Sequence, residues 1–414
     1  MHRGSLIGVM LALAAPSVAR AQAAPVVAIV GESGLNVLHD EFRATGPVEY
    51  PAGMPAPVFV DLPAGGTFAQ RMAQLRQGAL SHLTPGTLYA VRGTRVLVYA
   101  PAVTAPGDAG DTDVLDSTAG AADLAPLQHG TGATASAIGA TTGTAPDALA
   151  VFVTGNYDSP AAWAWLSRQA WVDVSSVSGY VVTTNGTCRS GAEARATVAA
   201  GHTIFSSSGN ATDGQEQLVT PNGLPEVYRV GGVDATGRTW LPGHPEEQDP
   251  SFALLGGVTR PYDTGGLYSF MSAAPDSESG LQHFGGTSGA TPRTAGFALR
   301  LIAAARSILG GGPAAGAYAR VAPGVTPPTT GPLADGAFTG DDLTALLRHT
   351  ATPHETASPV RYLVEGYGAV TAESIGLAER VLRGQAPAPA RPDEDRAHDA
   401  VTAARTALFA TGRC

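Results

Sequence analysis

The sequence predicts an α/β protein with a doubly wound, mostly parallel sheet and helices on both faces. Short runs of β-branched and apolar residues, typical of strands buried on both faces of a sheet, alternate with stretches of helical periodicity. Two such helical stretches lie at 159–170 and 189–200. Ligands bind at the carboxyl ends of the strands in these sheets, so functional residues are expected there. The expected strands lie at 26–30, 88–100, 148–155, 172–178, 201–210 and 227–237.

The composition excludes several classes of function. The chain has 414 residues, of which 44% are hydrophobic and 14% charged, and this balance is typical of a folded globular protein. It contains no lysine, because all 25 residues in the Lys+Arg count are arginine. Schiff-base lysine chemistry and the P-loop lysine are therefore excluded. The formal net charge of −10 argues against a nucleic-acid partner.

Residues 1–23 are predicted to be a signal peptide. Arg3 gives a positive start, an apolar run follows from Leu6 to Ala15, and the tripeptide ending at Ala23 matches an A-x-A cleavage site. The run is too short to span a bilayer, which takes about 20 residues. We therefore expect a secreted protein, extracellular or periplasmic, with no membrane anchor, and we expect it to be a monomer.

The rest of the chain is predicted to form one main domain at 24–384, followed by a Pro-rich linker and a C-terminal helix at 385–414. The Pro/Gly-rich region at about 43–128, which surrounds a helical stretch, is interpreted as an insertion in that domain. Cys188 and Cys414 suit an oxidising compartment, where they either pair or remain as free thiols.

The residues around Ser288 are typical of a nucleophile. In GGTSGATPRTAG, residues 285–296, the serine lies between small residues that would let a substrate backbone approach. A long apolar helical run follows, so the positive end of a helix would face charge that develops beside the serine. Alanine at position 290 excludes the G-x-S-x-G turn of the α/β-hydrolases. A turn that only caps a helix is the alternative interpretation.

His129 is the candidate general base. It lies in QHGTGATASAIGA, before a glycine and a run of small residues that predicts a helix. A ring at the start of a helix would be held at a cleft, where histidine is the usual base. His202, at the start of a predicted strand, and His283, near Ser288, are weaker candidates.

Asn210 is the candidate oxyanion donor. It ends the stretch SSSGN at the carboxyl end of a predicted buried strand. The loss of such a side-chain donor typically lowers turnover by about 10²–10³. An ordinary Gly-Asn turn is the alternative.

Taken in order, His129, Asn210 and Ser288 resemble the motifs of the subtilisin-like serine peptidases. That family carries H-G-T, A-A-G-N and G-T-S-x-A-x-P, and this chain has HGT, SSGN and GTSGATP. The similarity extends to VYRVGGVDATG at 227–237 and EGYGAVTAESIGLAERVL at 365–382, so it covers most of residues 25–383. The resemblance implies a subtilisin-like fold and a secreted serine endopeptidase with a Ser-His-acid triad and an asparagine in the oxyanion hole.

The acid of that triad is where the sequence departs from the family. The family's first strand ends in D-S/T-G, whereas this chain has GESG and places Glu32 at the aspartate position, with a side chain one methylene longer. Glutamate orients the histidine in some hydrolase triads. Asp116, in DVLDSTAG before His129, is the alternative acid.

The resemblance also implies which residues bind a protein or peptide substrate. Ser178 and Gly179 would lie on an edge that pairs with an extended chain, and Ser207, Ser208 and Gly209 would wall the main specificity pocket. No cofactor is expected. The acidic pairs at 111–113 and 341–342 match no calcium-loop spacing, so no metal is expected either.

Secreted family members usually carry a propeptide, but here the first expected strand follows the signal at once. Activity would then be restrained elsewhere or not at all. The glutamate and this short leader leave one alternative function, a catalytically impaired peptidase fold that binds peptides or proteins without cutting them.

Overall fold

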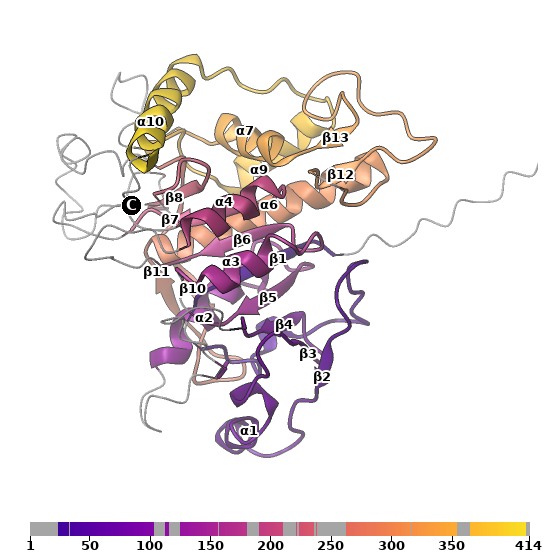
Figure 1. Ribbon diagram of the computed structural model, residues 1–414, viewed down its shortest axis with the longest axis vertical. Helices are drawn as coiled ribbons and strands as arrows, with labels where there is room; N and C mark the ends of the chain where they lie inside the picture. The colour runs from indigo at the N-terminus through magenta and orange to yellow at the C-terminus, as the bar shows by residue number, and fades with distance from the viewer. Residues whose placement is uncertain are drawn as a thin grey trace, which may run out of the picture.

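A nine-stranded sheet forms the centre of the molecule (Figure 1). The computed structural model describes residues 24–32, 34–102, 112–115, 125–155, 157–179, 190–209, 221, 223–235, 237, 262–314, 316–353 and 365–410. The strand order is β2-β3-β4-β5-β1-β6-β7-β8-β9, and every neighbouring pair is parallel except β3 and β4. The strands are β1 (Val26–Val30), β2 (Val58–Val60), β3 (Leu88–Val91), β4 (Val96–Tyr99), β5 (Leu149–Val153), β6 (Val174–Val177), β7 (Thr203–Ser207), β8 (Tyr228–Val233) and β9 (Thr264–Leu267).

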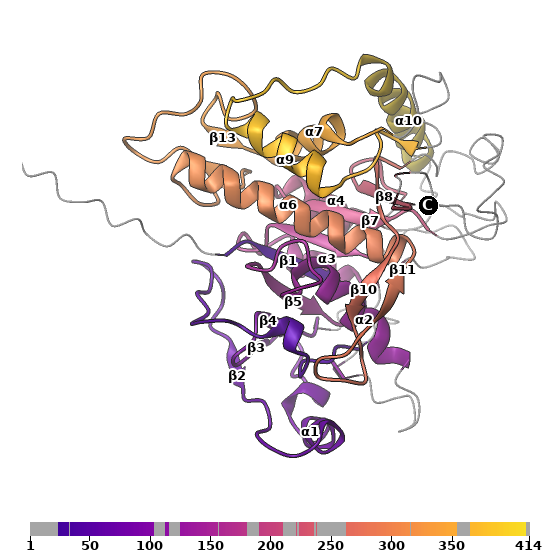
Figure 2. The ribbon, with the colours of Figure 1, turned by 180° about the vertical axis from the view of Figure 1, so that it is seen from behind.

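Helices cover both faces of this sheet, as the sequence predicts. Side chains of β1 alternate between the two cores, so that Val27 and Ile29 face one core and the other residues of the strand face the second. On the first face lie α2 (Ala125–Ile138), α6 (Thr287–Leu309), α7 (Gly340–Thr350) and α9 (Ala372–Leu382), and on the second lie α3 (Pro160–Leu166) and α4 (Gly191–Ala199) (Figures 1 and 2). The predicted doubly wound α/β class is confirmed.

The long helix α6 crosses the first face, and its carboxyl end is fixed by a buried ion pair. Arg306, near the end of α6, bonds to Asp173, which immediately precedes β6. The same carboxylate accepts the backbone N–H of Val26 at 2.8 Å, and the Arg306 guanidinium also donates to the carbonyl of Tyr318 at 3.0 Å. One pair of charges therefore joins α6 to the amino ends of β1 and β6.

The segment interpreted as an insertion extends the main sheet. Its strands β2, β3 and β4 are added beside β5, and its helix α1 (Phe68–Leu75) begins at a capping box formed by Thr67 and Gln70. The edge strand β2 exposes Val58 and Phe59, and the guanidinium of Arg92 lies 4.2 Å from the centre of the Phe59 ring.

Three elements differ from the sequence prediction. The run at 88–100 forms two antiparallel strands instead of one, because Gly93 has a positive φ of 73° and Thr94 bonds back to Val91. The Pro-rich linker, predicted at 386–396, is partly helical, because α10 (Pro392–Ala410) begins within it. His129 lies in the second turn of α2 and not in the first, because the helix begins at Ala125.

Smaller elements complete the first face and the chain's end. A hairpin of β10 (Ser269–Ala273) and β11 (Leu281–Gly285) leads directly into α6, and β12 (Ala319–Arg320) pairs with β13 (Ala337–Phe338). Asp395 of α10 accepts hydrogen bonds from Tyr367 at 2.8 Å and His349 at 3.0 Å. None of the described helices is long and apolar enough to cross a bilayer.

Candidate active site

The site begins at the carboxyl end of β1, in the middle of the sheet. This is the topological switch point of the sheet, because parallel strands lie on both sides of β1, β5 on one and β6 on the other. Glu32 follows this strand, and its side chain is fully buried. Its Oε2 atom bonds to Nδ1 of His129, whereas its Oε1 atom has no hydrogen-bond partner within the described structure. At this switch point, a buried carboxylate therefore lies within bonding distance of an imidazole 97 positions away in the sequence.

His129 is held from two sides. Glu32 bonds to one ring nitrogen, and the ring of Phe284 meets the imidazole edge-on at 5.5 Å between centroids. About a third of the His129 side chain, 34%, is exposed, so the ring reaches the surface. The negative charge of Glu32 raises the pKa of His129 above its usual value, against the opposing effect of burial. His129 is therefore a base with a fixed ring and a raised affinity for protons.

Ser288 is the second residue of α6, in the first turn of the helix, where the helix dipole favours an anion. Its side chain is nearly buried, with 9% of the residue exposed. The hydroxyl donates to the carbonyl of Ser178 at 2.9 Å, and this bond holds it against the residue that follows β6.

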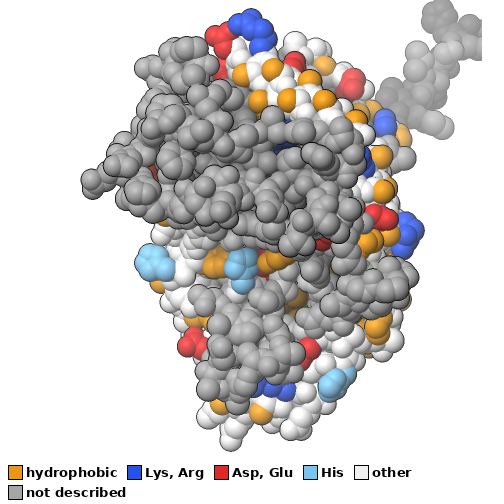
Figure 3. Space-filling model, turned by 60° about the vertical axis from the view of Figure 1, so that its left-hand side comes forward, with side chains coloured by type: hydrophobic (Ala, Val, Ile, Leu, Met, Phe, Trp, Pro, Cys, Tyr) orange, Lys and Arg blue, Asp and Glu red, His pale blue; other side chains and the backbone are white. Residues whose placement is uncertain are grey.

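The predicted substrate residues gather at the same edge of the sheet. Ser178 and Gly179 follow β6, and Ser208 and Gly209 follow β7, which ends at Ser207. Because β6 is parallel to its neighbour β1, and β7 is parallel to β6, their carboxyl ends lie at the same edge of the sheet as Glu32. Figure 3 shows histidine and hydrophobic side chains together in the middle of this face.

Tyr157 lies beneath this edge and has no motif in the sequence. Its ring packs directly on Gly179, where an added Cβ would overlap the ring, and a Cβ at Gly31 would overlap both the backbone and the ring of Tyr157. Burial raises the pKa of the Tyr157 hydroxyl far above its usual value, and the nearby charge of Glu32 adds to this effect. The phenol is therefore neutral, and it fills the space between the end of β1 and the substrate edge.

The two histidines that the sequence offers as weaker candidates occupy other positions in the fold. His202 precedes β7 and so lies at the opposite edge of the sheet, where burial lowers its pKa to about 4. His283 is an exposed residue of β11. Neither replaces His129 as the partner of the buried carboxylate.

Several predicted residues lie outside the described residues. They are Asn210, the alternative acid Asp116, the signal peptide at 1–23 and both cysteines, Cys188 and Cys414. Of the acidic pairs, Asp342 is used in the capping box of α7 with Thr339. Among the described residues, no three His, Cys, Asp or Glu side chains form a group that could hold a metal ion.

Gly132 lets the hairpin approach the helix that carries His129. A Cβ at this position would lie 2.5 Å from the Phe284 ring. We expect Gly132→Ala to lower the free energy of unfolding by about 1–3 kcal/mol, because the hairpin must move away from α2. Urea unfolding measures this loss. Gly46→Ala is the control, since a Cβ there would meet no described atom within 4 Å; equal stability of the two variants would contradict the close-packing interpretation.

The comparisons with known proteins find relatives by structure only. No family model and no curated protein sequence matches the chain. The patellamide maturation protease PatA is similar, with 15% identity, a TM-score of 0.46, and coverage of 87% of this chain and 98% of its own. The prenylagaramide maturation protease PagA has 16% identity, a TM-score of 0.44, and coverage of 86% and 93%.

A cold-adapted subtilisin-like serine proteinase is also similar, with 16% identity and a TM-score of 0.44, covering 83% of this chain and 87% of its own. It belongs to the family that the motifs of this chain resemble. Because these likenesses are distant, we base the function proposed below on the residues of this chain.

Proposed function

We propose that this chain is a subtilisin-like serine endopeptidase that cleaves peptide bonds with Ser288, His129 and Glu32. The observation that carries the proposal is the bond between the buried Glu32 carboxylate and Nδ1 of His129, at the strand switch where the sheet would bind a ligand. An orienting acid, a base and a serine at a helix amino terminus are the parts that acyl transfer requires. The same bond favours Glu32 over Asp116 as the acid.

In the proposed mechanism, the Ser288 hydroxyl turns from the Ser178 carbonyl toward Nε2 of His129 when substrate binds. His129 takes the proton as Ser288 Oγ attacks the peptide carbonyl, and it later gives that proton to the leaving amine. Glu32 keeps the second proton of the ring on Nδ1 and stabilises the imidazolium. Water then attacks the acyl-enzyme, with His129 again as the base.

Charge on the carbonyl oxygen would be stabilised by two groups. One is the backbone N–H of Ser288 at the start of α6, where the helix dipole favours an anion. The other is the side-chain amide of Asn210, one residue beyond Gly209. We assign this role to Asn210 from the motif alone.

The substrate would bind as an extended strand beside Ser178 and Gly179, and its side chain would enter the pocket walled by Ser207, Ser208 and Gly209. The serine side chains favour a small or wet pocket over a large apolar one. We further propose that the protein acts as a secreted monomer on protein or peptide substrates, without a metal or cofactor.

A fluorophosphonate probe tests this function directly, because it forms an adduct only with an activated serine. We expect intact mass spectrometry to show one adduct on the wild type and none on Ser288→Ala or His129→Ala, with casein cleavage lost in parallel. Ser279→Ala, which removes an exposed serine of the β10–β11 loop, is the matched control and should label normally. A folded wild type that takes no label and cleaves nothing would overturn the proposal.

A further inference from the structure

The segments near Glu32, His129 and Ser288 are joined a second time, away from the reacting atoms, by the backbone and side chain of one residue. Asn36 lies four residues after Glu32 and is completely buried. Its backbone N–H donates to Oγ1 of Thr131 at 2.8 Å, and Thr131 is two residues after His129 in α2. Asn36 therefore connects the strand that bears the acid to the helix that bears the base.

The amide of the same residue reaches the hairpin that precedes the nucleophile. Asn36 Nδ2 donates to the carbonyl of Ser277 at 2.7 Å and to that of Ala274 at 3.4 Å. Both carbonyls lie in the loop between β10 and β11, and β11 ends at Gly285, just before Ser288. The Oδ1 atom accepts the N–H of Leu38 at 3.1 Å, so both amide hydrogens and the amide oxygen are engaged.

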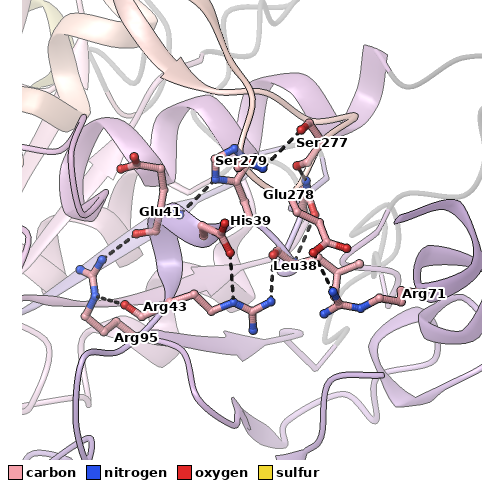
Figure 4. Close-up of polar contacts among 11 residues, drawn as sticks. Leu38, His39, Glu41, Arg43, Arg71, Arg95, Ser277, Glu278 and Ser279 are labelled. Atoms are coloured by element: carbon pink, nitrogen blue, oxygen red, sulfur yellow. Dashed lines mark hydrogen bonds and ion pairs between the residues drawn. The ribbon is translucent and has the colours of Figure 1, made fainter. Parts of the chain in front are cut away.

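Other hydrogen bonds and ion pairs near Asn36 each join two segments of the chain (Figure 4). The N–H of Asp40 donates to the carbonyl of Glu278 at 2.6 Å, and His39 Nε2 donates to the carbonyl of Gly280 at 2.8 Å while its Nδ1 accepts the N–H of Glu41. Arg71 of α1 pairs with the Glu278 side chain at 2.7 Å.

On the side of α2, the hydroxyl of Ser272 in β10 donates to the carbonyl of Gly132 at 3.0 Å. This contact also joins two segments, the hairpin and the helix. Asn36 differs because it bonds to both other segments, to α2 through its backbone N–H and to the hairpin loop through its side-chain amide.

We infer that Asn36 is a positioning residue, which sets the separation of His129 and Ser288 by holding the hairpin loop and α2 to the segment that follows Glu32. The inference rests on the proposed function. Reaction rates are sensitive to placement, and an error of about 1 Å from a distant change can cost about 10²-fold. A buried amide with every hydrogen-bonding atom used is a rigid means of fixing such a distance.

Asn36→Asp is the sharpest variant, because it keeps the shape and the acceptor for Leu38 but turns an oxygen toward the Ser277 and Ala274 carbonyls. We expect kcat and the rate of fluorophosphonate labelling to fall about 10–100-fold, with KM changed less than about threefold. Asn36→Ala should show a similar loss. Glu278→Gln, which removes only the ion pair of the same loop with Arg71, is the matched control and should stay within about twofold of the wild type.

The pH profile separates positioning from a simple loss of stability. A buried carboxyl facing two carbonyls has a raised pKa, and its protonated form can again donate to Ser277. The ratio of Asn36→Asp activity to wild-type activity should therefore rise as the pH falls, when both are assayed well below their melting temperatures. A variant that melts earlier but keeps wild-type kcat at every pH would overturn the inference.

Hydrogen exchange tests the junction independently of activity. We expect Asn36→Asp to increase exchange together at 274–280, at 285–289 and at 129–133, and Glu278→Gln to affect only the first range. Faster exchange confined to the hairpin loop, or to residues 36–38, would overturn the inference. If the wild type takes no fluorophosphonate label, the proposed function fails, and the exchange result still decides whether Asn36 joins the three segments.

Discussion

Replacing Glu32 by glutamine is expected to lower kcat about 10⁴-fold, the size of effect seen when a triad acid becomes an amide. Glutamine has nearly the same size and shape as glutamate, so it should fit the buried site without disturbing the fold. It can present an N–H to Nδ1 of His129, which would move the ring proton to Nε2, where the base must accept a proton from Ser288. Steady-state cleavage of a peptide substrate measures the loss.

The pH dependence of the Glu32 variant has a defined sign. Only neutral His129 can act as the base, so kcat/KM rises with pH through the pKa of the free enzyme's imidazole. The charge of Glu32 raises that pKa above the usual value of 6.5. Without this charge the pKa falls, so the rise of kcat/KM should move to lower pH in Glu32→Gln.

Asp116→Asn is the matched control, because Asp116 is the other carboxylate that the sequence offers. We expect Asp116→Asn to keep wild-type kcat, and its kcat/KM to rise over the same pH range as that of the wild type. Glu32→Asp keeps the charge but withdraws the carboxylate by about 1.5 Å, and it should lose less activity than Glu32→Gln. If Asp116→Asn lost about 10⁴-fold while Glu32→Gln retained activity, the assignment of the acid would be wrong.

Loss of the Arg306 guanidinium is expected to give the largest loss of stability, about 3–5 kcal/mol in Arg306→Met. Methionine fills much of the volume but leaves the Asp173 carboxylate buried without its cation, beside the N–H of Val26. Both side chains are nearly inaccessible, at 5% and 2% exposure, so water cannot replace the lost partner. Urea unfolding followed by circular dichroism measures the change.

Arg300→Ala is the control from the same helix. Arg300 pairs with Glu379 at 2.9 Å, but its side chain is 39% exposed, so the pair is screened by water and its loss should cost less than about 1 kcal/mol. Similar losses in the two variants would show that burial does not govern the strength of these ion pairs in α6.

The part of the fold and site that could be predicted is the part with a local pattern. Uninterrupted apolar runs indicated β1 and β5, and a motif around each of Glu32, His129 and Ser288 indicated the candidate site. The bond between Glu32 and His129 is consistent with those motifs. The turn between β3 and β4 was missed although residues 92–95, RGTR, interrupt the apolar run, because the stretch was interpreted as one strand despite its central glycine.

The residues that sequence reasoning missed act through tertiary contacts. Asn36, Tyr157 and Phe284 belong to no motif, and their places depend on how close two distant segments come, as where Phe284 meets Gly132. The hairpin before Ser288 was also missed, because its exposed residues break the apolar pattern. A glycine beside a motif residue, such as Gly132, was the available signal that something packs closely there.

The strand β2, at one edge of the sheet, affects how the protein behaves at high concentration. An open strand edge is a template for pairing with another chain and so for aggregation. In β2 that edge is only three residues long, Pro57 precedes it and Pro63 follows soon after, and the cation of Arg92 covers the exposed ring of Phe59. A second chain would find few backbone positions to pair with there, so the sheet that the inserted strands enlarge resists growing from one molecule to the next.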